Sequence, residues 1–133
     1  MTDARYLKLL WIYVALTVAA IVSMFFPDYS EGLLAAYDSE PSRWILGDSW
    51  LANCIMGGFL LAWLAGLAGL FFFKTWARSL SLCSTLASFL ISSYMGASLY
   101  GALENALFEA SSIIWGAILA LSYFSPVSDR FGR

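Results

Sequence analysis

Residues 49–73 read SWLANCIMGGFLLAWLAGLAGLFFF and carry no charge between Asp48 and Lys74. At a rise of about 1.5 Å per residue, a helix of this length exceeds the roughly 30 Å hydrocarbon core of a bilayer. Apolar runs of this length are typical of membrane-spanning helices. The stretch therefore predicts a protein that resides in a membrane.

Three further uncharged runs accompany this one, at residues 9–27, 79–103 and 110–128. Of all 133 residues, 61% are hydrophobic and 12% are charged, whereas about 25% of residues are charged in a typical soluble domain. Soluble enzymes, disordered regulators and disulfide scaffolds are therefore poor interpretations. We predict an all-α, integral membrane four-helix bundle that forms a single domain over residues 1–133. Its spans are expected at about 8–27, 50–73, 78–100 and 105–125, with an outer loop at 28–49.

The basic residues indicate how the spans are oriented. Only Arg43 lies in the outer loop, which is otherwise acidic. Because basic residues favour the cytoplasmic side of a membrane, both termini of this multi-pass protein are expected in the cytoplasm. The first span stays apolar to Phe26 without a convincing cleavage site, so we expect it to remain uncleaved. The basic residues expected on the inner side are Arg5, Lys8, Lys74, Arg78, Arg130 and Arg133.

The residue inventory excludes several kinds of chemistry. The chain has no histidine, and histidine is the commonest metal ligand and general base. Cys54 and Cys83 lie in different spans and are expected to be small buried hydrophobes rather than a redox pair. A net charge of −2 without a basic patch argues against a nucleic-acid partner. We therefore expect no cofactor, no metal and no enzymatic activity; an enzyme acting on lipid or quinone is the least supported alternative.

Small residues recur at every fourth position in each expected span. Such rows let helix backbones approach closely, which is how membrane helices associate. The rows predict a compact bundle in which every helix has a packing face and no water-filled pore runs through the middle. They comprise Ala15, Ala19 and Ser23; Gly58, Ala62 and Gly66; Ser84, Ser88, Ser92 and Gly96; and Ser112, Gly116 and Ala120.

The outer loop is the one sizeable segment expected outside the membrane. Ser30 and Glu31 can begin a short interfacial helix, and Pro41 suits the first turn of a second one. An acidic and aromatic loop of this kind either caps the outer end of the bundle or recognises a partner that arrives from outside. Under the second interpretation, the partner-binding residues are Asp38, Glu40, Trp44 and Asp48.

Few polar side chains are expected at membrane depth. Asn53 begins the second span, and Glu104 and Glu109 begin the fourth. Ionisable groups in a membrane are costly, which makes them candidate functional residues, but a carboxylate in the first helical turn is also favoured by the helix dipole. Glu104 and Glu109 lie about 140° apart around a helix and make a poor carboxylate pair. For all three residues, a structural role such as capping or an interhelical hydrogen bond stands beside a functional one.

Two patches are more specific than the rest of the chain, GLFFFKTWAR at 69–78 and LSYFSPV at 121–127. Both resemble segments of small four-span bacterial inner-membrane proteins that have no assigned activity, and the resemblance extends to the plan of the whole chain. It implies a bacterial inner-membrane location and identifies no active residues. From the residues alone, the two patches predict a tight inner turn and a helix stop at Pro126.

Two functions fit these observations. The first is a non-catalytic inner-membrane protein that binds a protein partner, either as an accessory subunit of a membrane complex or as an immunity-type protein that blocks a toxin. Small size, the packing rows and the acidic loop favour it. The alternative is a small oligomeric channel or transporter in which Glu109 and Asn53 face a path between subunits. Membrane lipid is an expected partner in both cases, together with a protein partner or further copies of the chain.

Overall fold

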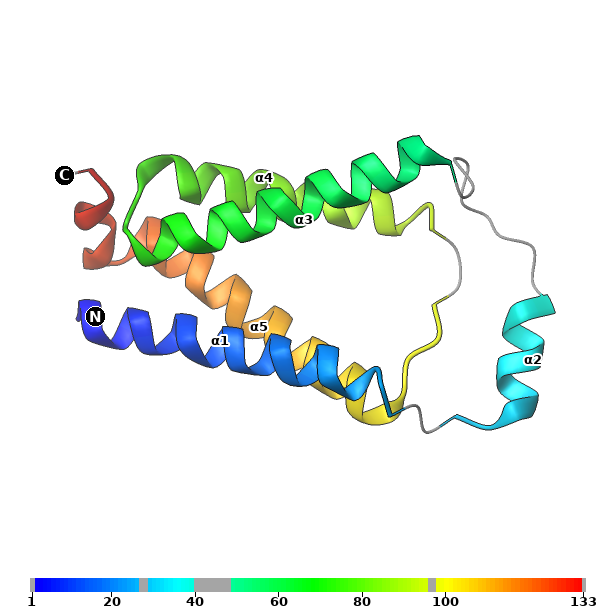
Figure 1. Cartoon of the computed structure of the whole chain (residues 1–133). Coiled ribbons are helices and arrows are strands. Elements are labelled where there is room, and N and C mark those ends of the chain that lie inside the picture. The colour runs from blue at the N-terminus through cyan, green and yellow to red at the C-terminus, as the bar shows by residue number, and fades with distance from the viewer. Residues whose placement is uncertain (1, 27–28, 40–48, 96–97, 133) are drawn as a thin grey trace. The chain divides into compact units, whose positions relative to one another are not determined.

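The computed structural model describes residues 2–26, 29–39, 49–95 and 98–132, and all regular secondary structure in these segments is helical. This confirms the all-α prediction. α3 begins at Trp50 as predicted, whereas α1 begins earlier than expected, with Asp3 in its first turn, where the helix dipole favours an acidic residue. The elements are α1 (Asp3–Ser23), α2 (Glu31–Ser39), α3 (Trp50–Phe71), α4 (Thr75–Ser92), α5 (Ala102–Phe124) and the 3-10 helix η1 (Pro126–Gly132) (Figure 1).

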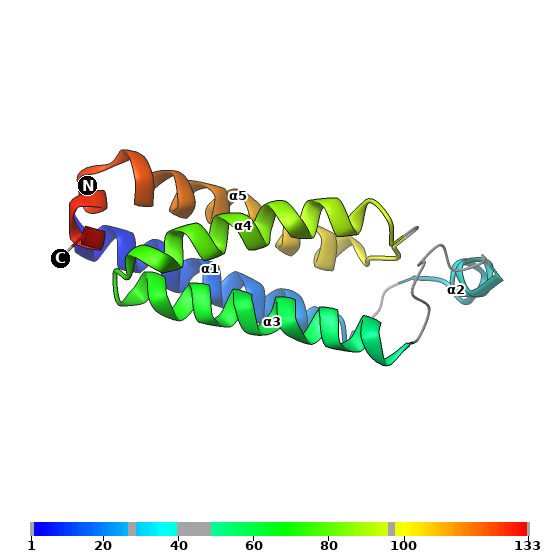
Figure 2. The same cartoon turned by 90° about the horizontal axis from the view of Figure 1, so that it is seen from above.

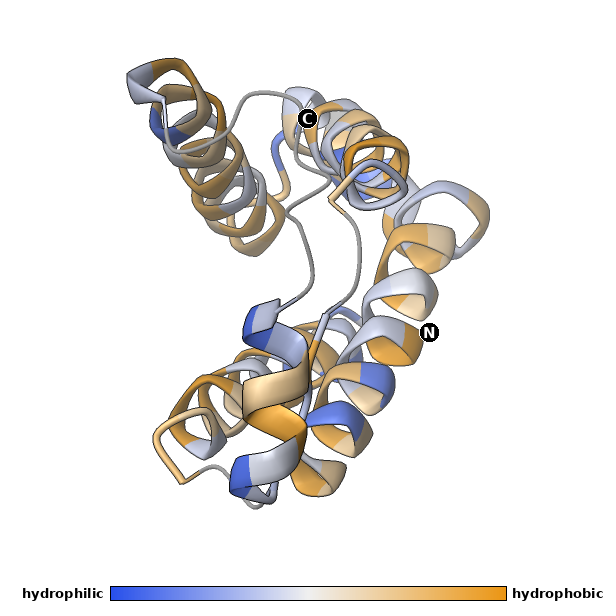
Figure 3. Ribbon diagram, turned by 90° about the vertical axis from the view of Figure 1, so that its right-hand side faces the viewer, coloured by the Kyte–Doolittle hydropathy of each residue, from blue (hydrophilic) through white to orange (hydrophobic). Residues whose placement is uncertain are grey.

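Three of the helices, α1, α3 and α5, are long and apolar enough to cross a membrane. Only 22–28% of the residues in their apolar windows are buried, and Trp11, Leu61 and Ile113 are 64%, 68% and 74% exposed. Figure 3 shows hydrophobic residues along the length of the long helices. Exposed apolar surface of this extent is unfavourable in water and suits the hydrocarbon of a bilayer. The chain therefore has the helices of a membrane protein.

α4 is shorter and more polar than the other long helices. The sequence predicts a span over 78–100, but α4 ends at Ser92. Because of its serines and Arg78, its hydropathy is lower than that of the three helices that are apolar enough to cross a membrane. The Ser93 hydroxyl donates to the Phe89 carbonyl at 3.0 Å, and the Tyr94 N–H donates to the Ile91 carbonyl in a tight turn. α4 therefore gives way to a turn at Ser93 and Tyr94, before the uncharged run ends.

The helices group into two compact units, one of residues 1–40 and 98–128 and one of residues 41–97 and 129–133. In the first unit, α1 and α5 pack antiparallel (Figures 1 and 2). The rings of Tyr13 and Trp115 stack with their centroids 4.6 Å apart, and the hydroxyls of Thr17 and Ser111 share a 2.9 Å hydrogen bond. Thr17 follows Tyr13 by about one turn in α1, and Ser111 precedes Trp115 by about one turn in α5. The two contacts therefore define the antiparallel register. The buried side chains of the two helices are Tyr6, Leu10, Tyr13, Ala20, Glu104, Ser111, Trp115, Ile118, Leu119 and Ser122.

In the second unit, α3 and α4 form an antiparallel hairpin whose backbones approach closely at two glycines (Figure 2). A Cβ atom at Gly66 would lie 2.5 Å from the Oγ atom of Ser81, and one at Gly69 would lie 2.5 Å from the Cβ atom of Ala77. Carbon atoms do not approach other heavy atoms so closely, so neither position has room for a larger residue without movement of its neighbour. Gly66 therefore has the packing role that its small-residue row predicts.

The rows of α1 and α5 do not line the contact between these two helices. Ala19 in α1 is exposed, as are Ser112 and Gly116 in α5, and a Cβ atom at Gly58 or Gly116 would meet nothing within 4 Å. Within this unit, the predicted rows therefore do not supply the packing face. The α1–α5 contact is made by large aromatic and aliphatic side chains, which fill the space that small residues would otherwise close.

The two cysteines are free thiols on exposed positions of α3 and α4. The expectation that Cys54 and Cys83 are buried is therefore wrong. Both lie on helix faces that carry exposed apolar side chains, with Leu51 beside Cys54 and with Leu86 and Leu90 beside Cys83. A thiol behaves as a small hydrophobe, so such a face suits it as well as a core does.

The connection between α3 and α4 is a tight turn at residues 72–74, as the first specific patch predicts. The Lys74 N–H donates to the Gly69 carbonyl at 2.8 Å, and the Phe73 N–H donates to the Leu70 carbonyl at 3.2 Å. These are the two bonds of a Schellman motif, in which the residue after the cap adopts a left-handed conformation. Phe73 occupies that position with a φ of 52°, where glycine is usual and another residue costs about 1–2 kcal/mol.

Phe131 packs against this turn from η1. Its ring meets the ring of Phe73 edge to face at a centroid distance of 5.3 Å, and the Arg78 guanidinium lies 4.9 Å from the centroid of the Phe131 ring. Phe131 is 1% exposed. An aromatic pair and a cation–π contact contribute about 0.5–1.5 and 0.5–2 kcal/mol, which is enough to offset the left-handed conformation of Phe73. α5 itself ends at Phe124, just before Pro126, as predicted.

Candidate functional site

The first turn of α5 is organised by Glu104. The helix begins at Ala102 after Gly101, so Glu104 lies inside the helix as its third residue. Its carboxylate is 7% exposed and accepts a 3.3 Å hydrogen bond from the Gly101 N–H. This contact satisfies a donor that the helix leaves open, and it places a negative charge at the positive end of the helix dipole. Glu104 therefore caps α5 from inside the helix, rather than lying in a turn before it.

Glu109 lies on a different face of α5 and is exposed. Its Oε1 atom accepts a 3.1 Å hydrogen bond from the Asn105 side-chain amide one turn earlier. One turn later, the Ser112 hydroxyl donates to the Phe108 carbonyl at 2.9 Å. Asn105, Glu109 and Ser112 follow one another at spacings of four and three residues, so they form one polar stripe along an otherwise apolar helix. The separate environments of Glu104 and Glu109 agree with the prediction that they are no carboxylate pair.

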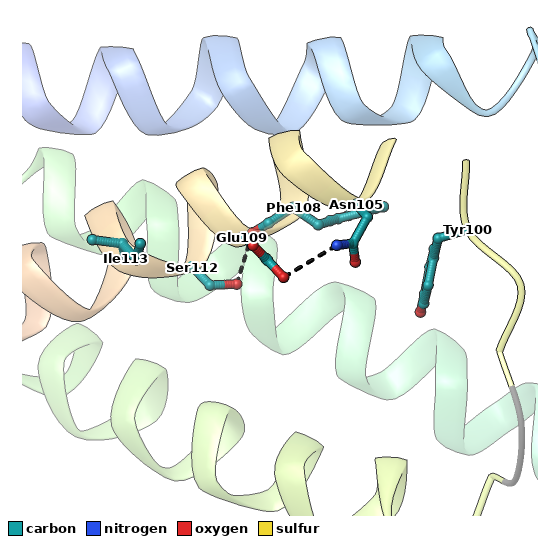
Figure 4. Close-up of a pocket in the computed structure, with 6 residues that line it drawn as sticks. All are labelled: Tyr100, Asn105, Phe108, Glu109, Ser112 and Ile113. Atoms are coloured by element: carbon teal, nitrogen blue, oxygen red, sulfur yellow. Dashed lines mark hydrogen bonds between the residues drawn. The ribbon is translucent and has the colours of Figure 1, made fainter. Parts of the chain in front are cut away.

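The polar stripe borders an open groove of about 490 Å³ (Figure 4). Tyr100, in the segment before α5, stands at one end of the groove, and its ring meets the ring of Phe108 edge to face at a centroid distance of 5.9 Å. Ile113 lies at the opposite end, where it is 74% exposed. The lining residues are Tyr100, Asn105, Phe108, Glu109, Ser112 and Ile113. A charged acceptor, an aromatic pair and an aliphatic side chain are thus presented on one surface.

The remaining predicted residues lie elsewhere in the fold. Asn53 is exposed in the first turn of α3, just after Ser49, whose side chain accepts from the Ala52 N–H at 3.3 Å. Asp38 is exposed near the end of α2. The other three predicted partner-binding residues, Glu40, Trp44 and Asp48, lie outside the described residues, as does the second predicted loop helix at Pro41.

α2 is the one short helix that the sequence predicts and the structure describes. Its nine residues include no buried side chain. Leu33, Leu34 and Tyr37 are 50%, 42% and 40% exposed, and their spacing places them on one face. Figure 3 shows hydrophilic residues toward both ends of the helix, where Glu31 and Asp38 lie, with hydrophobic residues between them. α2 therefore presents an uncovered apolar face between two negative charges.

Glu109 was predicted from the sequence, whereas the residues around it were not. Asn105 lies four residues before Glu109, a spacing at which an amide and a carboxylate on a helix meet, so this contact could have been found. The contribution of Tyr100 could not, because it depends on the path of the chain before α5. The arrangement offers a negative charge and several hydrogen-bond acceptors, which suit a cation or a donor. Within the described segments, no three His, Cys, Asp or Glu side chains gather as metal ligands.

No protein-family model, no curated protein and no solved structure matches this chain.

Proposed function

We propose that this chain is a non-catalytic protein of a bacterial inner membrane that binds a protein partner through its outer loop. The observation that carries the proposal is the uncovered apolar face of α2. Leu33, Leu34 and Tyr37 remain exposed although each would gain from burial. In this proposal the partner, for example another subunit of a membrane complex, covers this apolar face. Its basic groups pair with the negative charges of Glu31 and Asp38.

The proposed topology has four spans with both termini in the cytoplasm. α4 contains 18 residues, so its length is about 27 Å, close to the roughly 30 Å of the hydrocarbon core. Two of its hydroxyls bond to its own backbone: Thr85 and Ser88 donate to the Ser81 and Thr85 carbonyls at 2.8 Å. Such internal bonds lower the cost of serine and threonine in hydrocarbon. The basic residues at the α3–α4 turn favour a cytoplasmic position for that turn.

Native mass spectrometry of the protein, extracted gently from its own membrane, tests the proposal. We expect a second protein at fixed stoichiometry. The triple variant Asp38→Asn, Glu40→Gln, Asp48→Asn removes three negative charges from the outer loop and is expected to lose that second protein. The matched control Asp3→Asn, Asp129→Asn removes charges from the other predicted side of the membrane and is expected to keep it.

The outcomes separate the two functions. A second protein that survives the triple substitution excludes the acidic loop as the binding surface. A complex that contains only copies of this chain contradicts partner binding and favours the second candidate.

The second candidate function, a small oligomeric channel or transporter, is favoured by the exposed carboxylate of Glu109 on a membrane-capable helix. In this proposal Glu109 and Asn53 line a path between subunits. Proteoliposomes are expected to show proton- or cation-linked flux that disappears in Glu109→Gln and persists in Asp129→Asn. Flux no greater than in empty liposomes removes this candidate.

A further inference from the structure

The α5 groove has a polar wall that consists of acceptors. Among the residues that the structure describes, Asn105 is the one hydrogen-bond partner of Glu109, and it occupies only the Oε1 atom. The Ser112 hydroxyl has already given its proton to the Phe108 carbonyl, so the oxygen that it presents is an acceptor. A negative charge and open acceptor sites favour a positively charged ligand and disfavour an anion.

The other walls are apolar and aromatic. Tyr100 is 51% exposed and stands beside Phe108, and Ile113 extends the surface beyond Glu109 (Figure 4). The face of an aromatic ring attracts a cation, most strongly where water is excluded. Ile113 offers contact to a hydrocarbon group. The groove volume of about 490 Å³ lies within the roughly 300–1,000 Å³ of typical small-molecule sites.

The position of Glu109 along α5 adds a second constraint. α5 begins at Ala102 and ends at Phe124, so the helix continues for only about 22 Å after Glu109, which is less than the roughly 30 Å hydrocarbon core. Glu109, the eighth residue of α5, therefore lies within about two turns of the start of the helix, toward the head-group layer of a bilayer that α5 crosses. Ile113, one turn further along, lies on the hydrocarbon side. A ligand at this groove places its charge toward the head-group layer and its apolar part deeper in the hydrocarbon.

We propose that the α5 groove binds an amphipathic organic cation. Its charged group contacts Glu109 on the side of Asn105 and Tyr100, and its apolar part lies over Ile113. Two sources supply this chemistry: a phospholipid with an ammonium head group, or a lipophilic cation dissolved in the membrane. The proposal goes beyond binding of a protein partner and does not depend on it.

The first test measures binding of tetraphenylphosphonium by calorimetry to the full chain in nanodiscs of phosphatidylglycerol, a lipid without an ammonium group. Tetraphenylborate, which has the same shape and the opposite charge, reports non-specific partitioning. Binding of the cation is expected to weaken at least about tenfold in Glu109→Gln, the loss expected for about 1.4 kcal/mol, and to be partly restored in Glu109→Asp. Tyr100→Leu is expected to weaken it several-fold. Asp129→Asn, which removes an exposed carboxylate outside the groove, is the matched control and is expected to bind normally.

The second test identifies the source of the cation. Native mass spectrometry of protein taken from mixed bilayers of phosphatidylethanolamine and phosphatidylglycerol counts the lipids that remain bound. Retention of phosphatidylethanolamine by the natural chain and its loss in Glu109→Gln assigns the groove to a lipid head group, whereas Glu109-dependent tetraphenylphosphonium binding alone assigns it to a lipophilic cation. Because Glu109 is exposed and glutamine retains an acceptor for Asn105, the variant is expected to keep the unfolding midpoint of the natural chain. Equal affinity of the natural chain and Glu109→Gln for both cations, or equal binding of tetraphenylborate, overturns the proposal.

Discussion

Single residues control how closely the two helices of the α3–α4 hairpin approach. At Gly66, one hydrogen atom in place of a Cβ leaves room for the Ser81 hydroxyl. Gly58 belongs to the same small-residue row in the same helix, yet it faces open space. The pair provides a natural comparison, because both positions are helical and only one touches a neighbouring helix.

We expect Gly66→Ala to unfold at a lower temperature than Gly58→Ala in the same detergent. Both substitutions gain helix propensity, but only the first forces a methyl group against Ser81, and overpacking of this kind costs about 1–3 kcal/mol. The double variant Gly66→Ala, Ser81→Ala removes the opposing oxygen and is expected to recover most of the loss. Thermal unfolding followed by circular dichroism measures all three. Identical midpoints for the two alanine variants would show that the backbones are not close at Gly66.

At the scale of helices, the α1–α5 register depends on a few specific contacts between two largely apolar surfaces. Tyr13 stacks on Trp115, and Thr17 bonds to Ser111. A hydroxyl pair inside an apolar interface gains stability because neither group has water as an alternative partner, and such pairs are worth about 0.6–2 kcal/mol in membranes. It also fixes the register, because a shift of either helix would leave both groups unpaired.

This register predicts a specific disulfide. In a background with Cys54 and Cys83 replaced by alanine, Thr17→Cys with Ser111→Cys is expected to cross-link within one chain on mild oxidation, because the two hydroxyl oxygens are 2.9 Å apart. Thr17→Cys with Ser112→Cys is the control, since Ser112 lies about 100° further around α5 and is exposed. Electrophoresis with and without reductant detects the intrachain bond. Cross-linking of both pairs to the same extent would contradict the register.

Spacing of charges predicted where helices occur, but it did not predict every boundary or any packing face. The start of α3 and the end of α5 follow from the runs between charges and from Pro126. The end of α4 does not, because the helix turns at Ser93 and Tyr94 while the uncharged run continues to Leu103. The packing faces of α1 and α5 are equally hidden, since a helix that is apolar on all sides carries no periodic signal for its buried side. Of the candidate site, Glu109 and its partner Asn105 are readable from spacing, whereas the groove needs the position of Tyr100.

At the scale of the whole molecule, α4 decides the topology. The four uncharged runs predict four spans, which the basic residues orient, whereas hydropathy identifies three helices among the described residues that can cross a membrane. If α4 crosses, the α3–α4 turn and the segment before α5 lie on opposite sides of the membrane. If it does not, they lie on the same side.

Single cysteines in the cysteine-free background distinguish these topologies. We use cells whose inner membrane is intact and whose outer membrane has been permeabilised. In these cells, we expect a membrane-impermeant maleimide to label Asp38→Cys and Ser98→Cys from outside. Lys74→Cys and Asp129→Cys are expected to react only after the inner membrane is opened. All four positions are exposed, so a lack of labelling reports the side of the membrane rather than burial. Labelling of Lys74→Cys and Ser98→Cys from the same side would replace the four-span topology with one in which α4 does not cross.

The left-handed Phe73 has a consequence for the order in which the protein matures. Phe131, whose ring packs on Phe73, is translated after α3, α4 and all of α5. During synthesis, the α3–α4 hairpin therefore exists for a time with its turn in an unfavourable conformation and its aromatic partner not yet made. The hairpin reaches its final stability only when the later segment arrives, so the ribosome delivers the element that stabilises this turn after every long helix has already emerged.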